Sequence, residues 1–177
     1  MLPPLYASVT DPPQVAEAPQ PPSAGVTPLE ARILEVGEAN PDPETVMQGA
    51  LEARFGPFQS SGSHFLTGIH WFRIQAPPPG IPGPTPVLVA RSGLDQSVRV
   101  WARQGGQAIR LRLTTSVPKF GGAEDKVFAL PAGLDPDQPL YAQVAREGRA
   151  VTDLHFSAAT LSAQPSAGRR LVRGVAQ

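Results

Sequence analysis

The chain has 177 residues, enough for one domain with a substantial core but short for two. Fifteen basic residues balance fifteen acidic ones, so the overall charge gives no reason to expect nucleic acid or a membrane surface as a partner. Cysteine is absent, which excludes disulfides and thiol chemistry, and no apolar run approaches the roughly 20 residues that span a bilayer.

The N-terminal segment is rich in proline. Residues 1–28 hold eight prolines among small and polar side chains, a composition that predicts a disordered, polyproline-like leader. A helix is expected over Asn40–Arg54, because Asp42 suits the N-cap and Pro43 the first helical position. The apolar residues that recur on one face of this helix at helical spacing are Val46, Met47, Ala50 and Leu51.

Beyond the helix, short apolar runs alternate with turn residues, which is the pattern of an antiparallel β protein. The predicted strands are Ile33–Val36, Ile69–Gln75, Val87–Arg91, two arms of a hairpin within Ser97–Thr114, Lys126–Leu130, Leu140–Arg146 and Val151–Ala158. Six prolines make Ala76–Pro86 a long surface loop. Ser116–Asp125 is also expected to be a loop, and Glu147–Ala150 suits the turn of a second hairpin.

The clearest of these elements is the hairpin within Ser97–Thr114. Aliphatic residues alternate with polar ones on both sides of the Gly105–Gly106 turn, which predicts two half-buried strands. One face of the hairpin is aliphatic and faces a core. The other face carries Trp101 and a stripe of four arginines, which are Arg99, Arg103, Arg110 and Arg112.

About eight short strands with one brief helix predict an all-β fold, a jelly-roll-like antiparallel β-sandwich with a short N-terminal helix. A parallel α/β fold is disfavoured, because no helices separate the later strands. The expected organisation is a leader over residues 1–28, the sandwich over residues 29–162, and a flexible basic tail over residues 163–177.

Several short motifs carry a family likeness. Trp71–Arg73 on a strand, an aliphatic strand after it, and Leu94–Asp95 opening a strand that ends before Gly105–Gly106 form the first part. Phe128–Gly133 followed by the strand Leu140–Arg146 forms the second. Together they resemble the periplasmic type 2 extracellular domain of bacterial seven-transmembrane receptors with diverse intracellular signalling modules. The likeness covers roughly Ala31–Leu161.

This resemblance implies a jelly-roll-like sandwich similar to carbohydrate-binding modules. It implies a periplasmic domain that senses a small ligand, often thought to be a carbohydrate, ahead of the transmembrane and cytoplasmic signalling domains of the same full-length protein. The output of such receptors is commonly a diguanylate cyclase or a histidine kinase. The chain departs from the family pattern in its proline-rich leader, in the Ala76–Pro86 loop, and in the strand expected at Ile109–Leu113.

The candidate ligand-binding residues are aromatic and basic side chains on strand faces. Tryptophan stacks on sugar rings, and arginine grips hydroxyls and carboxylates. The residues are Trp71, Arg73, Arg99, Trp101 and Arg112, and a carbohydrate or an anion would suit them. The alternative interpretation is that the tryptophans pack against loops and the arginines form a solvated strand face.

No motif predicts catalysis, a metal or a cofactor. The chain lacks a GxSxG elbow, a P-loop and zinc-ligand spacing, and its three histidines are far apart. We therefore expect a ligand sensor that is not an enzyme and has no nucleic-acid partner; homodimerisation is left open. The alternatives are a stand-alone carbohydrate-binding or protein-interaction module and, with less support, a glycosidase-like enzyme whose two carboxylates converge in space.

Overall fold

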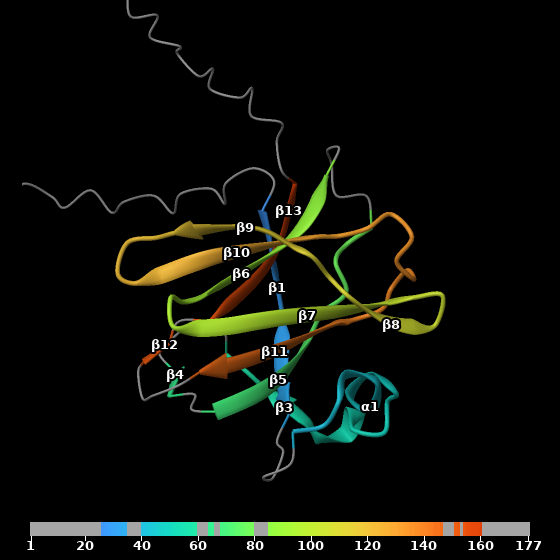
Figure 1. Ribbon diagram of the computed structural model, residues 1–177. Coiled ribbons are helices and arrows are strands. Elements are labelled where there is room, and N and C mark those ends of the chain that lie inside the picture. The colour runs from blue at the N-terminus through green and yellow to red at the C-terminus, as the bar shows by residue number, and fades with distance from the viewer. Residues whose placement is uncertain are drawn as a thin grey trace, which may run out of the picture.

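The structure is a computed structural model that describes residues 26–34, 40–59, 64–65, 68–79, 85–146, 151–152 and 154–160. Within these residues, strands dominate and all pair antiparallel, so the predicted all-β fold is confirmed (Figure 1). The predicted leader up to residue 25 and the tail over residues 163–177 lie outside the described residues. Val26–Pro28 does not belong to a leader, however, because it forms part of a strand.

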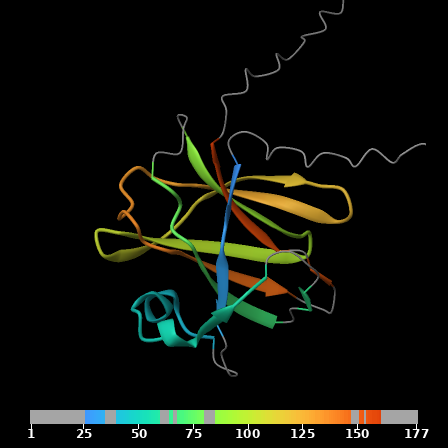
Figure 2. The same cartoon turned by 180° about the vertical axis from the view of Figure 1, so that it is seen from behind.

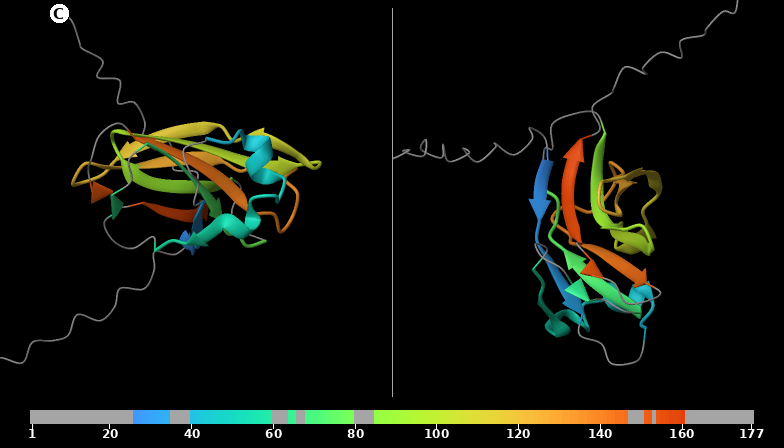
Figure 3. Two further views of the ribbon diagram at one scale, coloured as in Figure 1. Left: turned by 90° about the horizontal axis from the view of Figure 1, so that it is seen from below. Right: turned by 90° about the vertical axis from the view of Figure 1, so that its left-hand side faces the viewer.

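Two sheets face one another. The first has the order β1 (Val26–Leu29), β13 (His155–Thr160), β6 (Pro86–Gly93), β10 (Ala123–Ala129) and β9 (Leu113–Pro118). The second has the order β3 (Phe55–Pro57), β2 (Ala31–Leu34), β5 (Gly68–Ile74), β11 (Leu140–Arg146), β7 (Gln96–Gln104) and β8 (Gln107–Arg110). A small separate pair joins β4 (His64–Phe65) to β12 (Val151–Thr152). Figure 3 shows the two layers from below and from the side.

The strand order is that of a jelly roll. Strands β1, β13, β6 and β10 of one sheet and β5, β11, β7 and β8 of the other follow the arrangement in which the chain passes repeatedly between the two sheets. Strands β2, β3 and β9 extend this frame at its edges. Only Glu30 separates β1 from β2, so one nearly straight stretch of chain serves both sheets, as the reverse view shows (Figure 2).

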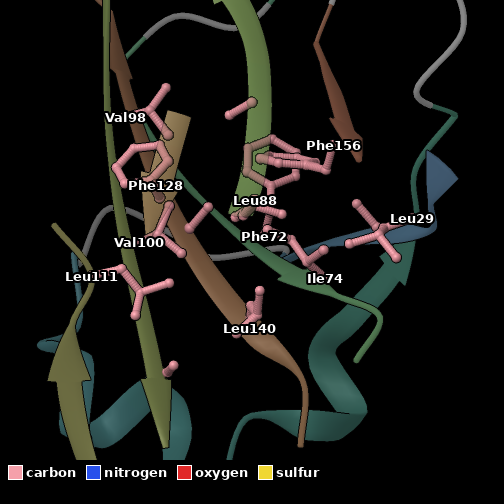
Figure 4. Close-up of a cluster of buried hydrophobic side chains, with 14 of the residues drawn as sticks. Leu29, Phe72, Ile74, Leu88, Val98, Val100, Leu111, Phe128, Leu140 and Phe156 are labelled. Atoms are coloured by element: carbon pink, nitrogen blue, oxygen red, sulfur yellow. The ribbon is translucent and has the colours of Figure 1, made fainter. Parts of the chain in front are cut away.

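The main core fills the space between the sheets. Alternate residues of β7 point inward, which is the period-two pattern that the sequence predicted. Phe72, Leu88, Val100, Ala142 and Phe156 are almost completely buried there. Figure 4 shows side chains from facing strands pointing toward one another, with Phe72 and Phe156 in contact at a ring-centroid distance of 5.9 Å.

A second, smaller core lies on the outer face of the six-stranded sheet. It is covered by helix α1 (Pro43–Met47) and the 3-10 helix η1 (Glu52–Arg54). The predicted caps are confirmed, since Asp42 accepts a hydrogen bond from the Thr45 N–H and Pro43 begins the helix. The predicted length is wrong: α1 ends at Met47, because Gly49 adopts a φ of +82° that no helix continues.

Three further predictions, about a loop and two hairpins, are also corrected. Within Ser116–Asp125, most residues belong to β9 and β10, which pair as a tight hairpin. The predicted second arm of the central hairpin ends at Arg110, and the chain crosses to the other sheet before Leu113. Glu147–Ala150 lies outside the described residues, but the strands on either side of it do not pair with each other. The two-residue turn Gly105–Gly106 is confirmed, with positive φ at both glycines as a type I′ turn requires.

Candidate functional site

Trp71 lies beneath the helical cover on the outer face of the six-stranded sheet. Its side chain is 1% exposed, and its indole N–H donates a hydrogen bond of 3.0 Å to Asn40 Oδ1. The same oxygen accepts a second hydrogen bond from the Gln143 side chain at 3.3 Å. The ligand-binding role predicted for Trp71 is therefore corrected. Its faces and its polar edge are already occupied by the protein, so it packs the second core.

Trp101 and Arg73 lie beside Trp71 on the same face. The two tryptophan rings are 5.0 Å apart between centroids, and Trp101 remains half-buried. Arg73 is half-buried too, and its Nε lies 2.9 Å from Glu52 Oε1. That distance defines an ion pair, although the N–H does not point at the oxygen well enough to make a hydrogen bond. Arg73 therefore helps to attach the η1 segment to the sheet, and Trp101 packs against the second core.

Two further contacts fix helix α1 over the sheet. The Arg103 guanidinium donates to the backbone carbonyls of Met47 and Gly106, so it joins the end of α1 to the β7–β8 turn. A cation at a helix C-terminus is favourable, because the last carbonyls of a helix lack intrahelical partners. The Glu44 side chain of α1 accepts a hydrogen bond from the backbone N–H of Ala108, so this N–H of the edge strand β8 already has a partner.

Three of the predicted basic residues remain in solvent. Arg99, Arg110 and Arg112 are exposed, and within the described residues none of them forms an ion pair or a side-chain hydrogen bond. The register places Arg99 and Arg110 on the same face as the tryptophans, through the pairs Gln143–Arg99 and Trp101–Arg110. Arg112 lies beyond the end of β8, where the chain crosses between the sheets. The structure thus gathers four of the five predicted residues on one face and separates Arg112 from them.

A hollow opens at one end of the sandwich, where β5, β7 and β10 end. Its volume is about 360 Å³. Its walls are residues 76–79 and most of residues 130–138, and its floor includes the core residues Ala102, Leu130 and Leu140. We call this the apolar hollow. Residues of the loop that joins β10 to β11 form part of its wall.

Asp135 fixes the loop that forms one wall of the apolar hollow. Its two carboxylate oxygens accept hydrogen bonds from the backbone N–H groups of Gly105 and Gly106, at 2.8 and 2.9 Å. Its own N–H donates to the Arg103 carbonyl. The hydrogen bonds from Gly106 and then Gly105 hold the pKa of the Asp135 carboxyl below its usual value. The wall is thereby tied to the β7–β8 turn.

A second hollow, of about 310 Å³, adjoins the first. Four charged side chains line it, and these are Glu30, Arg32, Arg73 and Asp137. The two hollows share Ala76 and Asp137, so they adjoin, and we refer to the pair as one depression with an apolar and a polar part. We call the second part the polar hollow. Asp137 has a φ of +57°, the one positive φ among the non-glycine residues described.

Among the described residues, no three histidine or carboxylate side chains converge as a metal site would need. No helix of the described part has the length and hydropathy to cross a membrane. The polar side chains that line the two hollows are those of arginine, aspartate, glutamate and glutamine.

The fold defines the class of this protein as a jelly roll, and comparison with known proteins does not place it in a family. No protein-family model matches the chain, and no curated protein matches it significantly.

The sequence pattern does not reveal the two hollows. The segments that line them show only residues typical of turns, which are the prolines of residues 77–79 and the Asp135–Pro136–Asp137 triplet. The first segment belongs to the surface loop predicted at Ala76–Pro86, and the second lies in the connection between β10 and β11. Nothing in their spacing showed that they meet at the same end of the sandwich, because that follows from the crossing of the chain between the sheets.

Proposed function

We propose that the domain is a non-catalytic module that binds a small ligand in the apolar hollow. The observation that supports this most directly is the hollow itself, an apolar depression of about 360 Å³ with a few polar groups at its rim. Binding sites for small molecules have this construction, with volumes of roughly 300–1,000 Å³. The wall that Asp135 ties to the β7–β8 turn makes the site preorganised, which lowers the entropic cost of binding.

Catalysis is a weaker hypothesis for the same site. Two carboxylates, Asp135 and Asp137, line the apolar hollow. Asp135 already accepts two backbone hydrogen bonds and its pKa is lowered, so it is a poor proton donor near neutral pH. A glycosidase-like mechanism requires one carboxyl to give up a proton and the other to attack or activate water. This pair is not arranged for that division of roles.

The place of the module in a larger protein is a further part of the proposal. We take the domain to be the extracytoplasmic sensor of a transmembrane receptor, on the strength of its resemblance to the type 2 extracellular domain. The jelly-roll fold agrees with what that resemblance implies. Ligand binding at one end of the sandwich would then bias a conformational equilibrium that the membrane and cytoplasmic domains report.

The binding proposal is tested by thermal stability against a panel of saccharides, amino acids and dicarboxylates. A compound at about 100 times its dissociation constant adds roughly 2.7 kcal/mol, or a few degrees in Tm. Ala132→Trp fills the apolar hollow from an exposed position, and Ala50→Trp is the matched control at an exposed site on another part of the surface. We expect a stabilising compound whose effect Ala132→Trp removes and Ala50→Trp preserves.

Two results would contradict the binding proposal. One is a panel without any stabilising compound. The other is a compound whose effect survives Ala132→Trp but is lost with Arg99→Gln, because the site would then lie on the outer face of the six-stranded sheet.

The receptor proposal is tested on the full-length gene product in its natural cell. We expect it in the membrane fraction, with this domain cleaved by protease added to spheroplasts. A product found only in the cytoplasm would exclude the receptor role and leave the stand-alone binding module.

A further inference from the structure

The two parts of the depression differ in chemistry, and together they describe a ligand. The apolar hollow is lined mainly by proline, leucine and alanine, and no aromatic side chain contributes among the residues that line it. Of its charged side chains, Arg103 is bound to two backbone carbonyls and Asp135 to two backbone N–H groups. This part of the depression can therefore receive an apolar body, and Asp137 and Gln138 are the lining side chains left to meet polar groups of a ligand.

A carbohydrate fits the apolar hollow poorly for the same reason. Sugar hydroxyls transferred to such a surface would lose hydrogen bonds to water without replacing them, at a cost for each unpaired group. Sugars also gain affinity by stacking on aromatic rings. The two tryptophans of the chain lie instead in and beside the second core, and neither lines either hollow.

Among the described residues, the polar hollow holds one cation and two carboxylates that have no partner. Neither Arg32 nor Asp137 forms a side-chain hydrogen bond or an ion pair there, and the Glu30 carboxylate forms none either. Arg73, the other cation of this hollow, is neutralised by Glu52 at 2.9 Å. A guanidinium binds a carboxylate, and an aspartate binds an ammonium group. A free guanidinium and free carboxylates beside an apolar hollow are the complement of a zwitterion with an apolar side chain. Asp137 is the carboxylate that lines both hollows, whereas Glu30 lines only the polar one.

Asp137 is held in place at the junction of the two hollows. Its φ of +57° is a conformation that aspartate and asparagine adopt more easily than other non-glycine residues. The same loop is tied to the β7–β8 turn through Asp135, two residues earlier. The carboxylate is therefore presented from a defined backbone, at the point where the apolar and polar parts of the depression meet.

We propose that the ligand of this site is a free α-amino acid with a large apolar side chain. The side chain occupies the apolar hollow, Asp137 binds the α-ammonium group, and Arg32 binds the α-carboxylate. This inference rests on the proposed binding function and narrows it to one class of ligand.

The test uses calorimetric titration of the whole chain with L-leucine and with two analogues that each lack one charge. L-leucinamide keeps the ammonium group, and 4-methylpentanoate keeps the carboxylate. Asp137→Asn should weaken L-leucine and L-leucinamide by about tenfold and leave 4-methylpentanoate unchanged. Asparagine keeps the backbone conformation at this position, so the variant removes only the charge.

Arg32→Gln should have the reciprocal effect. It should weaken L-leucine and 4-methylpentanoate by about tenfold and leave L-leucinamide unchanged. Arg110→Gln is the matched control, because Arg110 is an exposed arginine without a partner among the described residues and outside both hollows. It should leave all three affinities as they are.

The possible outcomes separate this inference from the function on which it rests. If L-leucine and L-phenylalanine fail to bind while another compound stabilises the protein in a manner sensitive to Ala132→Trp, the amino-acid inference is wrong and the binding function stands. If L-leucine binds equally well to Asp137→Asn and Arg32→Gln, the inference is likewise wrong. If no compound binds, the proposed function itself fails.

Discussion

Replacing Trp71 by phenylalanine tests whether this residue supports the fold or meets a ligand. The change removes the 3.0 Å hydrogen bond to Asn40 and leaves a cavity in the second core. Asn40 keeps its hydrogen bond from Gln143, so the oxygen is not stranded. The net loss of one hydrogen bond costs about 1 kcal/mol. A residual cavity of roughly 40 Å³ adds about 1 kcal/mol at about 24 cal/mol per Å³.

The expected result is a loss of about 2 kcal/mol in the free energy of unfolding, or roughly 6–8 °C in Tm for a domain of this size. Urea titration followed by circular dichroism measures the first quantity, and a thermal scan the second. Trp101→Phe is the control, since Trp101 is half-buried and its indole N–H has no hydrogen bond among the described residues. It should cost less than about 1 kcal/mol.

An unfolding free energy for Trp71→Phe within about 0.5 kcal/mol of the wild type would refute the reasoning. The helical cover would then be held by other contacts, and the hydrogen bond to Asn40 would contribute little. Ligand binding in the apolar hollow should survive Trp71→Phe, because Trp71 does not line either hollow.

Three further predictions concern two ion pairs of β10 and the β7–β8 turn. Asp125 is ion-paired to Arg91, and the hydrogen bond from Arg91 lowers the pKa of the Asp125 carboxyl. The ion pair therefore stabilises the fold above the unfolded pKa of aspartate, about 3.9, and this stabilisation is lost as the pH falls through the lower pKa of the folded state. Asp125→Asn should therefore lower Tm at pH 7 and match the wild type at about pH 2, and a Tm difference that persists at pH 2 would contradict this. Gly106→Ala places a side chain at a φ of +75° and should cost about 1 kcal/mol in urea unfolding; an unchanged midpoint would show that the turn relaxes freely. Lys126→Met leaves Glu124 without its partner at 2.9 Å and should cost about 2 kcal/mol, part of which Glu124→Gln should restore in the double variant. Equal stability of the single and double variants would exclude that coupling.

The sequence predicted best those strands that have one face toward the core and the other face outward. In β7, Val98, Val100 and Ala102 face the core, and the residues between them face outward, so periodicity alone identified the strand. The positive φ at Gly105 and Gly106 completed the signal, because few other residues fit that turn.

The errors arose where tertiary structure overrides the local pattern. Leu113 continued the alternation of Ile109 and Leu111, yet it is 46% exposed, because the chain changes sheets between β8 and β9. Alternation does not distinguish a strand that continues from one that crosses over. Helix α1 was predicted too long because helical spacing extends to Leu51, whereas Gly49 ends the helix by its backbone conformation.

The candidate site was the least predictable feature for a related reason. Tryptophan and arginine on a strand face suit both a sugar site and the underside of a covering segment. The choice between the two depended on residues 40–54, which cover Trp71. Arg32 belongs to no motif in the sequence and Asp137 stands in a triplet typical of turns, and only the crossing of the chain brings the two residues to the same hollow.

The pairing of β1 with β13 has a consequence for how the protein is made. Strand β13 lies between β1 and β6, so the last described strand separates the first one from the rest of its sheet. During synthesis, the five-stranded sheet cannot close until nearly the whole described chain has left the ribosome. Contacts between residues so distant in sequence make folding slow. A chain that stopped before His155 would leave β1 without a partner strand and the edge of β6 open to other molecules.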